Sequence, residues 1–319
     1  MIYLVMDNSI IFMGTPDFAV KSLDFLIKKN LSIDCVVTSP DKKSGRGLKI
    51  NESEVKKYSK LNKIKLLQPN NLTDPDFIKQ IKELNPALIV VVAFRKLPRI
   101  LYEIPKHGTI NLHASLLPDY RGAAPINWCL INNEKFTGVS IIKINEKIDY
   151  GKILMQEKVI IDKDEDYGTL KNKLSLIGSK ILYKTIDLIF KNQIKEKAQI
   201  ITENDKKAPK LTSENTRIDW DSSIDSIIGK IRGLAPKPGA WTILINDKDE
   251  IRMKILKARP ASYSKSNSKS ILLTQDKRIF ISTPNGEIEC DIIQLENKKA
   301  MTAKDTLNGY NFSSKCLVK

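Results

Sequence analysis

The sequence predicts an α/β fold in which a Rossmann-like domain with a parallel sheet precedes a small C-terminal β-barrel of OB-like type. In the first half of the chain, short apolar runs alternate with helix-like segments, as they do in parallel α/β sheets. From Ala240 onward, short strands separated by turn residues replace this alternation. The length of 319 residues also exceeds that of a usual single domain, so two domains are expected.

The elements expected in the first half begin with a buried strand at residues 9–13. A turn and a helix over residues 18–26 follow, with Asp17 as the expected N-cap. A second helix is expected over residues 74–84, and further strands are expected at residues 35–38, 64–67, 87–93 and 109–112. Because parallel sheets bind ligands outside the carboxyl ends of their strands, the loops after these strands are where a site is predicted.

The second half starts from a long helix expected over residues 167–190 and a polar segment that follows it. Short strands of the barrel are then expected at residues 241–245, 252–256, 270–273, 278–282 and 287–293. These patterns predict a first domain at residues 1–190, a linker at 191–207 and a C-terminal domain at 208–319.

Composition excludes several classes of protein. The hydrophobic fraction is 41%, and no apolar run approaches the ~20 residues that a membrane span needs. The first residues carry an acidic Asp7 and no basic region of the kind that opens a signal peptide. Four cysteines are scattered without CxxC spacing, which indicates reduced thiols and no zinc site. We therefore expect a cytoplasmic protein with no membrane partner and no metal.

The formal net charge of +16 has two explanations that the sequence leaves open. Lysine and arginine that neutralise phosphates gain affinity by releasing counterions, so the charge fits a nucleic-acid partner. A lysine-rich composition on a solvated surface would produce the same value. The positions of the basic residues have to decide between them.

Asn111 and His113 form the first candidate for chemistry, at the end of the strand expected at residues 109–112. Alternation along a strand places both side chains on one face of the sheet. An amide beside an imidazole suits acyl transfer, because the amide can stabilise an oxyanion while the imidazole handles a proton. A lone Asn-x-His pair is nevertheless more often structural than catalytic.

The residues that follow His113 change this assessment. The run HASLLPDYRGAAPINW at residues 113–128 resembles the signature of formyltransferases that use 10-formyltetrahydrofolate. The resemblance implies that Asn111 stabilises the oxyanion, that His113 handles the proton and that Asp149, in the loop KIDYG, is the third catalytic residue. It also implies that the folate donor contacts Ser115, Leu116, Leu117, Pro118, Phe94 and Arg95. Read without the resemblance, Asp149 is an ordinary turn residue.

Two of the loops expected at the site depart from the family's pattern. Tyr150 stands where the family usually has threonine, beside Asp149. Phe94 and Arg95 stand where tyrosine and glycine are common, and the loop here is one residue shorter before its proline.

The nature of the acceptor depends on a basic loop at residues 39–49, which glycines interrupt. Its Gly-Arg-Gly at residues 45–47 resembles the tRNA-binding insertion of the family members that act on methionyl-tRNA. Residues 218–220, 231–241, 295–301 and 307–309 resemble the C-terminal domain of the same members. The resemblance implies transfer to the methionine of initiator methionyl-tRNA for translation initiation, with tRNA contacts from Lys42, Lys43, Arg46, Lys49 and Lys210. We expect a monomer.

Two alternatives remain beside this interpretation. A formyltransferase that acts on a sugar nucleotide would share the signature, but it would need no basic insertion. A nucleotide- or RNA-binding protein without catalysis could also use an α/β sheet and a basic barrel. Against it, no GxGxxG follows the first strand and no RNP-like aromatic pattern is present.

Overall fold

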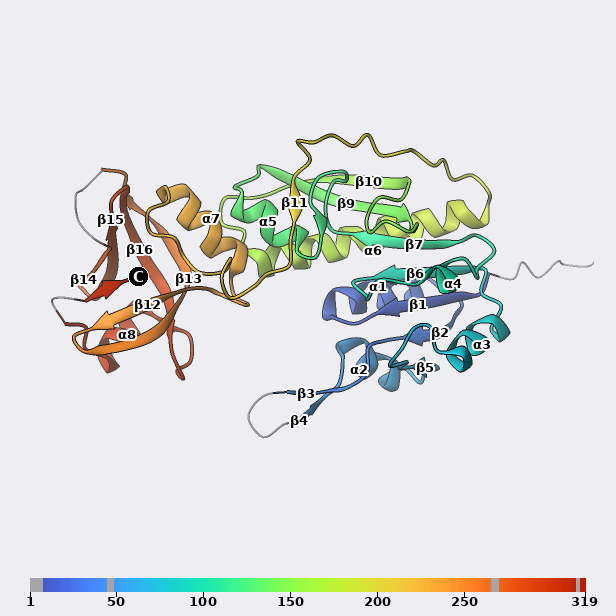
Figure 1. Cartoon of the computed structure of the whole chain (residues 1–319), viewed down its shortest axis with the longest axis horizontal. Coiled ribbons are helices and arrows are strands. Elements are labelled where there is room, and N and C mark those ends of the chain that lie inside the picture. Colours follow the sequence, from blue (N-terminus) through green and yellow to red (C-terminus); the bar gives the residue numbers. More distant parts are fainter. Residues whose placement is uncertain (1–7, 45–48, 265–269, 314–315) are drawn as a thin grey trace, which may run out of the picture. The chain divides into compact units, whose positions relative to one another are not determined.

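The computed structural model describes residues 8–44, 49–264, 270–313 and 316–319. These residues form two compact units (Figure 1). The first unit comprises residues 1–122, 137–159 and 171–207, and the second comprises 123–136, 160–170 and 208–319. Two internal segments thus cluster with the C-terminal part of the chain. The predicted domain limits of 1–190, 191–207 and 208–319 stay predictions.

A seven-stranded sheet, in the order β10-β9-β7-β6-β1-β2-β5, forms the centre of the first unit (Figure 1). Its strands are β1 (Ile10–Gly14), β2 (Ile33–Val37), β5 (Leu66–Leu67), β6 (Leu88–Val92), β7 (Thr109–His113), β9 (Phe136–Lys143) and β10 (Ile153–Ile160). The pairs among β5, β2, β1, β6 and β7 are parallel, which confirms the predicted fold class. β9 pairs with β7 in antiparallel fashion and was not predicted.

Helices cover both faces of this sheet. They are α1 (Asp17–Lys28), α2 (Glu54–Leu61), α3 (Pro75–Glu83), α4 (Arg99–Tyr102) and α6 (Tyr167–Phe190). Phe77 of α3 and Leu101 of α4 pack in one apolar cluster with Val91 of β6. On the opposite face, Gly178 of α6 lies so close to Leu112 of β7 that an added Cβ would stand 3.0 Å from it. Alternation in β7 therefore turns Leu112 toward α6 and its two neighbours away from it.

The start of α1 corrects one prediction. The N-cap is Pro16, which has extended backbone angles, and Asp17 is the first helical residue. The Asp17 carboxylate accepts a hydrogen bond from the backbone N–H of Phe18 and lies in the first turn, where negative charge is favourable. Asp17 therefore acts on the helix start as a first-turn acid and not as its cap.

A short hairpin of β3 (Lys42–Ser44) and β4 (Lys49–Asn51) projects from the chain between β2 and α2. Lys42 pairs with Asn51, and Ser44 pairs with Lys49. The predicted Gly-Arg-Gly, including Arg46, lies outside the described residues.

The second unit contains the predicted barrel. Its strands are β12 (Ala240–Asn246), β13 (Asp249–Ser262), β14 (Ile271–Gln275), β15 (Arg278–Thr283), β16 (Gly286–Leu295), β17 (Met301–Thr302) and β18 (Leu317–Val318). Pairing of β13 with β16 closes a ring of six strands, to which β17 adds. Alternate residues fill its interior, among them Leu244, Met253 and Ile281, so the barrel prediction is confirmed.

Three helices belong to the second unit: α5 (Pro125–Ile131), α7 (Ile224–Leu234) and α8 (Ala303–Gly309). α5 and α7 pack closely because two glycines of α7 leave room for the facing helix. A Cβ on Gly233 would stand 2.8 Å from the Asn127 carbonyl oxygen, and the Asn127 amide donates to the Gly233 carbonyl at 2.7 Å. The short strands β8 (Arg121–Gly122) and β11 (Lys207–Ala208) complete the described elements. Within the described ranges, no helix is long and apolar enough to cross a bilayer.

Candidate active site

Asn111 and His113 lie at the carboxyl end of β7, on the sheet face opposite the one that α6 covers. His113 is buried, with 6% of its surface exposed, whereas Asn111 is partly exposed. The Asn111 side chain forms no hydrogen bond with the described residues, so its amide is available to a ligand. The register of β7 places Asn111 beside Val91 and His113 beside Ser140.

Two oxygen atoms flank the His113 ring. Nε2 lies 2.9 Å from the carbonyl oxygen of Tyr120, and Nδ1 lies 3.6 Å from Oδ1 of Asp149. Since a carbonyl can only accept, this contact requires the proton on Nε2. In the neutral ring, Nδ1 is then the basic nitrogen, and a proton taken up there faces the Asp149 carboxylate.

Asp149 is held from several sides in the loop between β9 and β10. Its carboxylate is about as buried as His113, and Oδ2 accepts a hydrogen bond from the Gly122 N–H at 3.0 Å. The residue has a positive φ of 61°, a backbone conformation that costs free energy for residues other than glycine. Gly151 is required nearby, because an added Cβ would stand 1.6 Å from the Lys143 carbonyl oxygen. Several independent contacts therefore fix this loop, as expected for a preorganised carboxylate.

The signature segment after His113 is tied down by its own polar network. The Ser140 hydroxyl donates to the Ser115 carbonyl at 2.6 Å and accepts from the Leu117 N–H at 3.1 Å. Gln156 donates to that hydroxyl and to the Leu117 carbonyl, at 2.8 and 3.0 Å. Both polar residues come from β9 and β10, so they could have been found only by predicting these strands.

The residues predicted to contact folate differ in exposure. Ser115 and Leu117 are buried, and the Ser115 hydroxyl donates to the Asp119 carbonyl at 2.7 Å. Leu116 and Pro118 are partly exposed, so they are the residues of this loop whose side chains can meet a ligand. The folate assignment of all four stays a prediction.

Phe94 and Arg95 follow β6 in the shortened loop. The Arg95 guanidinium lies 5.3 Å from the centre of the Phe94 ring and donates to the carbonyls of Pro69 and Asn70 at 2.7 and 2.9 Å. Desolvation lowers the pKa of Arg95 from its usual value. Arg95 therefore joins the loop after β6 to the loop after β5, and its folate contact also stays a prediction.

Arg121 is partly buried beside the loop of Asp149. Its guanidinium pairs with Asp205 and lies 4.0 Å from the centre of the Tyr150 ring. Hydrogen bonding from Thr202, together with the charge of Arg121, lowers the pKa of Asp205. Tyr150 thus replaces the family's threonine with a ring that stacks on the arginine of the signature.

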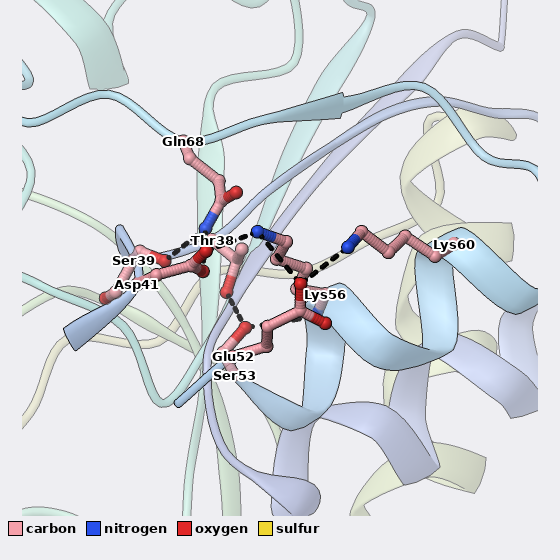
Figure 2. A network of polar contacts seen from close by, with 8 residues as sticks. All are labelled: Thr38, Ser39, Asp41, Glu52, Ser53, Lys56, Lys60 and Gln68. Atoms are coloured by element: carbon pink, nitrogen blue, oxygen red, sulfur yellow. Dashed lines mark hydrogen bonds and ion pairs between the residues drawn. The ribbon is translucent and has the colours of Figure 1, made fainter. Parts of the chain in front are cut away.

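The base of the β3–β4 hairpin is a second organised polar region (Figure 2). Lys56 of α2 is 8% exposed, and its ammonium pairs with Asp41 at 2.5 Å and with Glu52 at 3.3 Å. Asp41 precedes β3 and Glu52 follows β4, so one lysine joins the two ends of the hairpin. Hydrogen bonding from Lys56 lowers the pKa of Asp41, and hydrogen bonding to Asp41 raises that of Lys56.

Neighbouring residues extend this network, as Figure 2 shows. Gln68 donates to Asp41 and to the Ser39 carbonyl, while Lys60 pairs with Glu52 at 2.5 Å. The hydroxyls of Thr38 and Ser53 lie 2.8 Å apart. The hairpin therefore emerges from a fixed base at the carboxyl end of β2.

The residues predicted to contact tRNA lie in separate places. Lys42, Lys43 and Lys49 lie on the two strands of the hairpin, and Lys42 is exposed. Arg46 lies in the segment that the structure does not describe. Lys210 is exposed in the second unit. The tRNA contacts of these residues stay predictions.

Potential metal ligands do not gather in the described ranges, where no group of three or more His, Cys, Asp or Glu side chains could hold an ion. All four cysteines are buried and none forms a disulfide, and burial raises the pKa of Cys35 to about 11. These thiols therefore fill core space.

Known proteins resemble this chain along its whole length. The formyl transferase family model matches residues 8–186, and the model of the formyl transferase C-terminal domain matches residues 210–311. The methionyl-tRNA formyltransferase of Flavobacterium johnsoniae is 43% identical, with 97% of this chain and 98% of the relative covered. That of Thermodesulfovibrio yellowstonii is 42% identical, with 95% and 96% covered.

Solved structures share the fold at lower identity. A sugar 3N-formyl transferase, WlaRD, has a TM-score of 0.64 at 21% identity, with 92% of this chain and 99% of the other covered. The N-formyltransferase of Helicobacter canadensis has the same TM-score at 19% identity, with 88% and 98% covered. Since the family model covers more than half of the chain and relatives exceed 40% identity along nearly all of it, the chain belongs to the formyl transferase family, in the branch whose members are named methionyl-tRNA formyltransferase.

Proposed function

We propose that this enzyme transfers the formyl group of 10-formyltetrahydrofolate to the α-amine of methionine on initiator methionyl-tRNA, which yields N-formylmethionyl-tRNA. One observation carries the proposal: Asn111 and His113 share one strand face at the carboxyl end of β7, with Asp149 3.6 Å from His113, in a chain that matches a methionyl-tRNA formyltransferase over 97% of its length. The WlaRD structure was obtained with 5-N-formyl-THF, which fits a folate donor in this family.

The proton path follows from the His113 contacts. The α-amine attacks the formyl carbon, and the tetrahedral intermediate then breaks its bond to N10 of the folate, which leaves with a proton. Because Nε2 of His113 donates to the Tyr120 carbonyl, Nδ1 is the atom that accepts a proton from the amine and returns it to N10. Asp149, 3.6 Å from Nδ1, stabilises the positive ring in between. A free α-amine has a pKa of ~8, so a modest base suffices.

Asn111 is the residue that stabilises the oxyanion of the tetrahedral intermediate. Its side-chain amide lies on the same strand face as His113 and is not engaged by any described residue. An amide donor of this kind stabilises the developing charge by about 3 kcal/mol in comparable acyl-transfer sites. These roles need no covalent enzyme intermediate and no metal.

For the acceptor, the basic hairpin supports tRNA over a sugar nucleotide. Lys42, Lys43 and Lys49 belong to its two strands, Arg46 stands between the strands in the sequence, and Lys210 adds charge after the linker, so the region is rich in cations that could neutralise phosphates. The relatives that match end to end carry the methionyl-tRNA name, whereas the sugar enzymes share 21% identity or less. We further propose that the enzyme is a cytoplasmic monomer without a membrane partner.

The test is formyl transfer from 10-formyltetrahydrofolate to methionyl initiator tRNA and to methionyl elongator tRNA. The intact chain should prefer the initiator, and Arg46→Ala should weaken transfer and lower the salt dependence of tRNA binding by about one phosphate contact. Folate binding without transfer to either tRNA would overturn the proposal and favour a sugar-nucleotide acceptor. Tight tRNA binding without folate binding would instead indicate a non-catalytic RNA-binding protein.

A further inference from the structure

The segment after α6, predicted as a linker, makes ordered contacts with the catalytic loops. Lys197 and Ile153 exchange two backbone hydrogen bonds at 2.7 and 2.8 Å. Farther along, the Lys206 N–H donates to the Asp119 carboxylate at 2.9 Å, and the Lys206 carbonyl accepts from Tyr120 at 2.6 Å. Both ends of the segment are thus fixed to the first unit.

Gln199 lies between these ends and binds the loop of Asp149. Its Nε2 donates to the Asp149 carbonyl and to the Gly151 carbonyl, both at 2.8 Å. Its Oε1 atom is buried without a partner among the described residues, so the donor side alone orients the amide. Two hydrogen bonds from one amide fix the backbone on both sides of Tyr150, where Asp149 has its positive φ.

The same segment therefore reaches both partners of the His113 ring. Gln199 holds Asp149, which faces Nδ1, and Lys206 holds Tyr120, whose carbonyl accepts from Nε2. Apolar burial does not explain this arrangement, because Ile200 and Ile201 are 76% and 48% exposed. The contacts that fix the segment are polar, and those made by the Gln199 side chain can be removed by substitution while the backbone hydrogen bonds at both ends remain.

We propose that residues 197–206 are a strap that positions the two partners of His113, and that Gln199 is the positioning residue for Asp149. The proposal deepens the proposed function and rests on it for its effect on turnover. Asp205 contributes through its ion pair with Arg121, whose own backbone adjoins Tyr120.

The test compares Gln199→Glu with Gln193→Glu. Gln193 is an exposed glutamine between α6 and the strap, and its side chain forms no hydrogen bond with the described residues. A carboxylate at position 199 would face two carbonyl oxygens and repel them, so kcat should fall about tenfold while KM for both substrates is unchanged. Gln199→Met, which removes the donors without adding charge, should cause a similar loss. In an Asp149→Asn background, Gln199→Glu should have little further effect, because both changes act on one group.

A second measurement does not depend on turnover. Lys147 and Lys152 flank Asp149, so loosening the loop should speed trypsin cleavage at these sites in Gln199→Glu and not in Gln193→Glu. Unchanged cleavage and unchanged kcat would overturn the strap, as would additive losses in the Asp149→Asn background. If the intact chain transfers no formyl group but Gln199→Glu is still cleaved faster, the proposed function is wrong and the structural role of the strap is supported.

Discussion

The site around His113 and the base of the β3–β4 hairpin are both polar regions at carboxyl ends of parallel strands, yet they are built differently. Asp149 is held by the Gly122 amide, by Gln199 and by a loop that accepts only glycine at position 151. The hairpin is joined at its base by the ammonium of Lys56 (Figure 2). Several independent contacts on one residue are an advantage in a catalytic site, because reacting groups need placement within about 0.5 Å. At the hairpin, a buried lysine anchor and one hydrogen bond, between Thr38 and Ser53, join the two ends, which suits recognition by a projecting loop.

This comparison predicts that the largest effect comes from the reacting group itself. His113→Ala should lower kcat by roughly 10²- to 10⁴-fold, since it removes the atom that carries the proton. The other histidine provides a matched control, because His107 packs edge-on against Phe190 with ring centres 5.8 Å apart. His107→Ala should leave kcat within about twofold. Steady-state transfer assays check both, and a His113→Ala enzyme that kept a tenth of its activity would remove His113 from the mechanism.

Asp149→Asn is a second test of the site around His113. Asparagine keeps an oxygen for the Gly122 N–H but removes the charge that faces Nδ1 of His113. We expect kcat to fall roughly 10- to 100-fold, because the positive ring loses the opposite charge that stands 3.6 Å from Nδ1, with little change in thermal unfolding. A large drop in the unfolding temperature would show that the carboxylate holds the loop together and does not serve the reaction.

How far the sequence could predict these two regions depends on the range of the interactions. The strands that lead to Asn111 and His113 are local apolar runs, so the strands themselves and the shared face of these two side chains were predictable. Ser140 and Gln156, which hold the signature loop, were missed because residues 136–143 and 153–160 were not predicted as strands. Gln199 was missed because its segment is polar and aperiodic, which is typical of linkers. Contacts between residues 50 positions apart leave no local pattern.

The hairpin shows the converse. Its basic and glycine residues were recognised, but nothing in the local pattern singles out Lys56 from the other lysines of α2. Lys57 and Lys60 of that helix are more than half exposed, whereas the side chain of Lys56 is 11% exposed. Only the fold shows which lysine meets carboxylates from both ends of the hairpin.

Lys56→Met should therefore weaken tRNA use without affecting the chemistry. The substitution leaves Asp41 and Glu52 without their common partner, so the two ends of the hairpin are joined only by the hydrogen bond between Thr38 and Ser53 and are held less firmly. KM for tRNA should rise roughly two- to fivefold, while kcat and KM for folate stay constant. Lys57→Met is the control, because Lys57 forms an exposed pair with Glu54. Equal effects of the two variants would mean that lost charge, and not the anchor, is responsible.

The anchor should also be insensitive to pH during such assays. The pKa of Asp41 is lowered, so its stabilising contribution is complete above the unfolded value of about 3.9 and is lost only as the pH falls further. The pKa of Lys56 is raised, so its contribution is complete below about 10.4 and is lost above that. Between about pH 6 and 9, the ratio of KM for tRNA in Lys56→Met to KM for tRNA in the intact chain should thus stay constant.

The smallest effect is expected where the chain departs from its family. Tyr150→Thr removes the ring on which Arg121 stacks, a contact worth about 0.5–1 kcal/mol at a partly exposed site. Asp149 should stay in place, because Gly122, Gln199 and Gly151 fix it without help from the neighbouring ring. We therefore expect a slightly lower unfolding temperature and a kcat within about twofold of the intact chain. A loss comparable to that of Asp149→Asn would mean that the stack of Tyr150 on Arg121, and not the redundant hydrogen bonds, decides where the carboxylate lies.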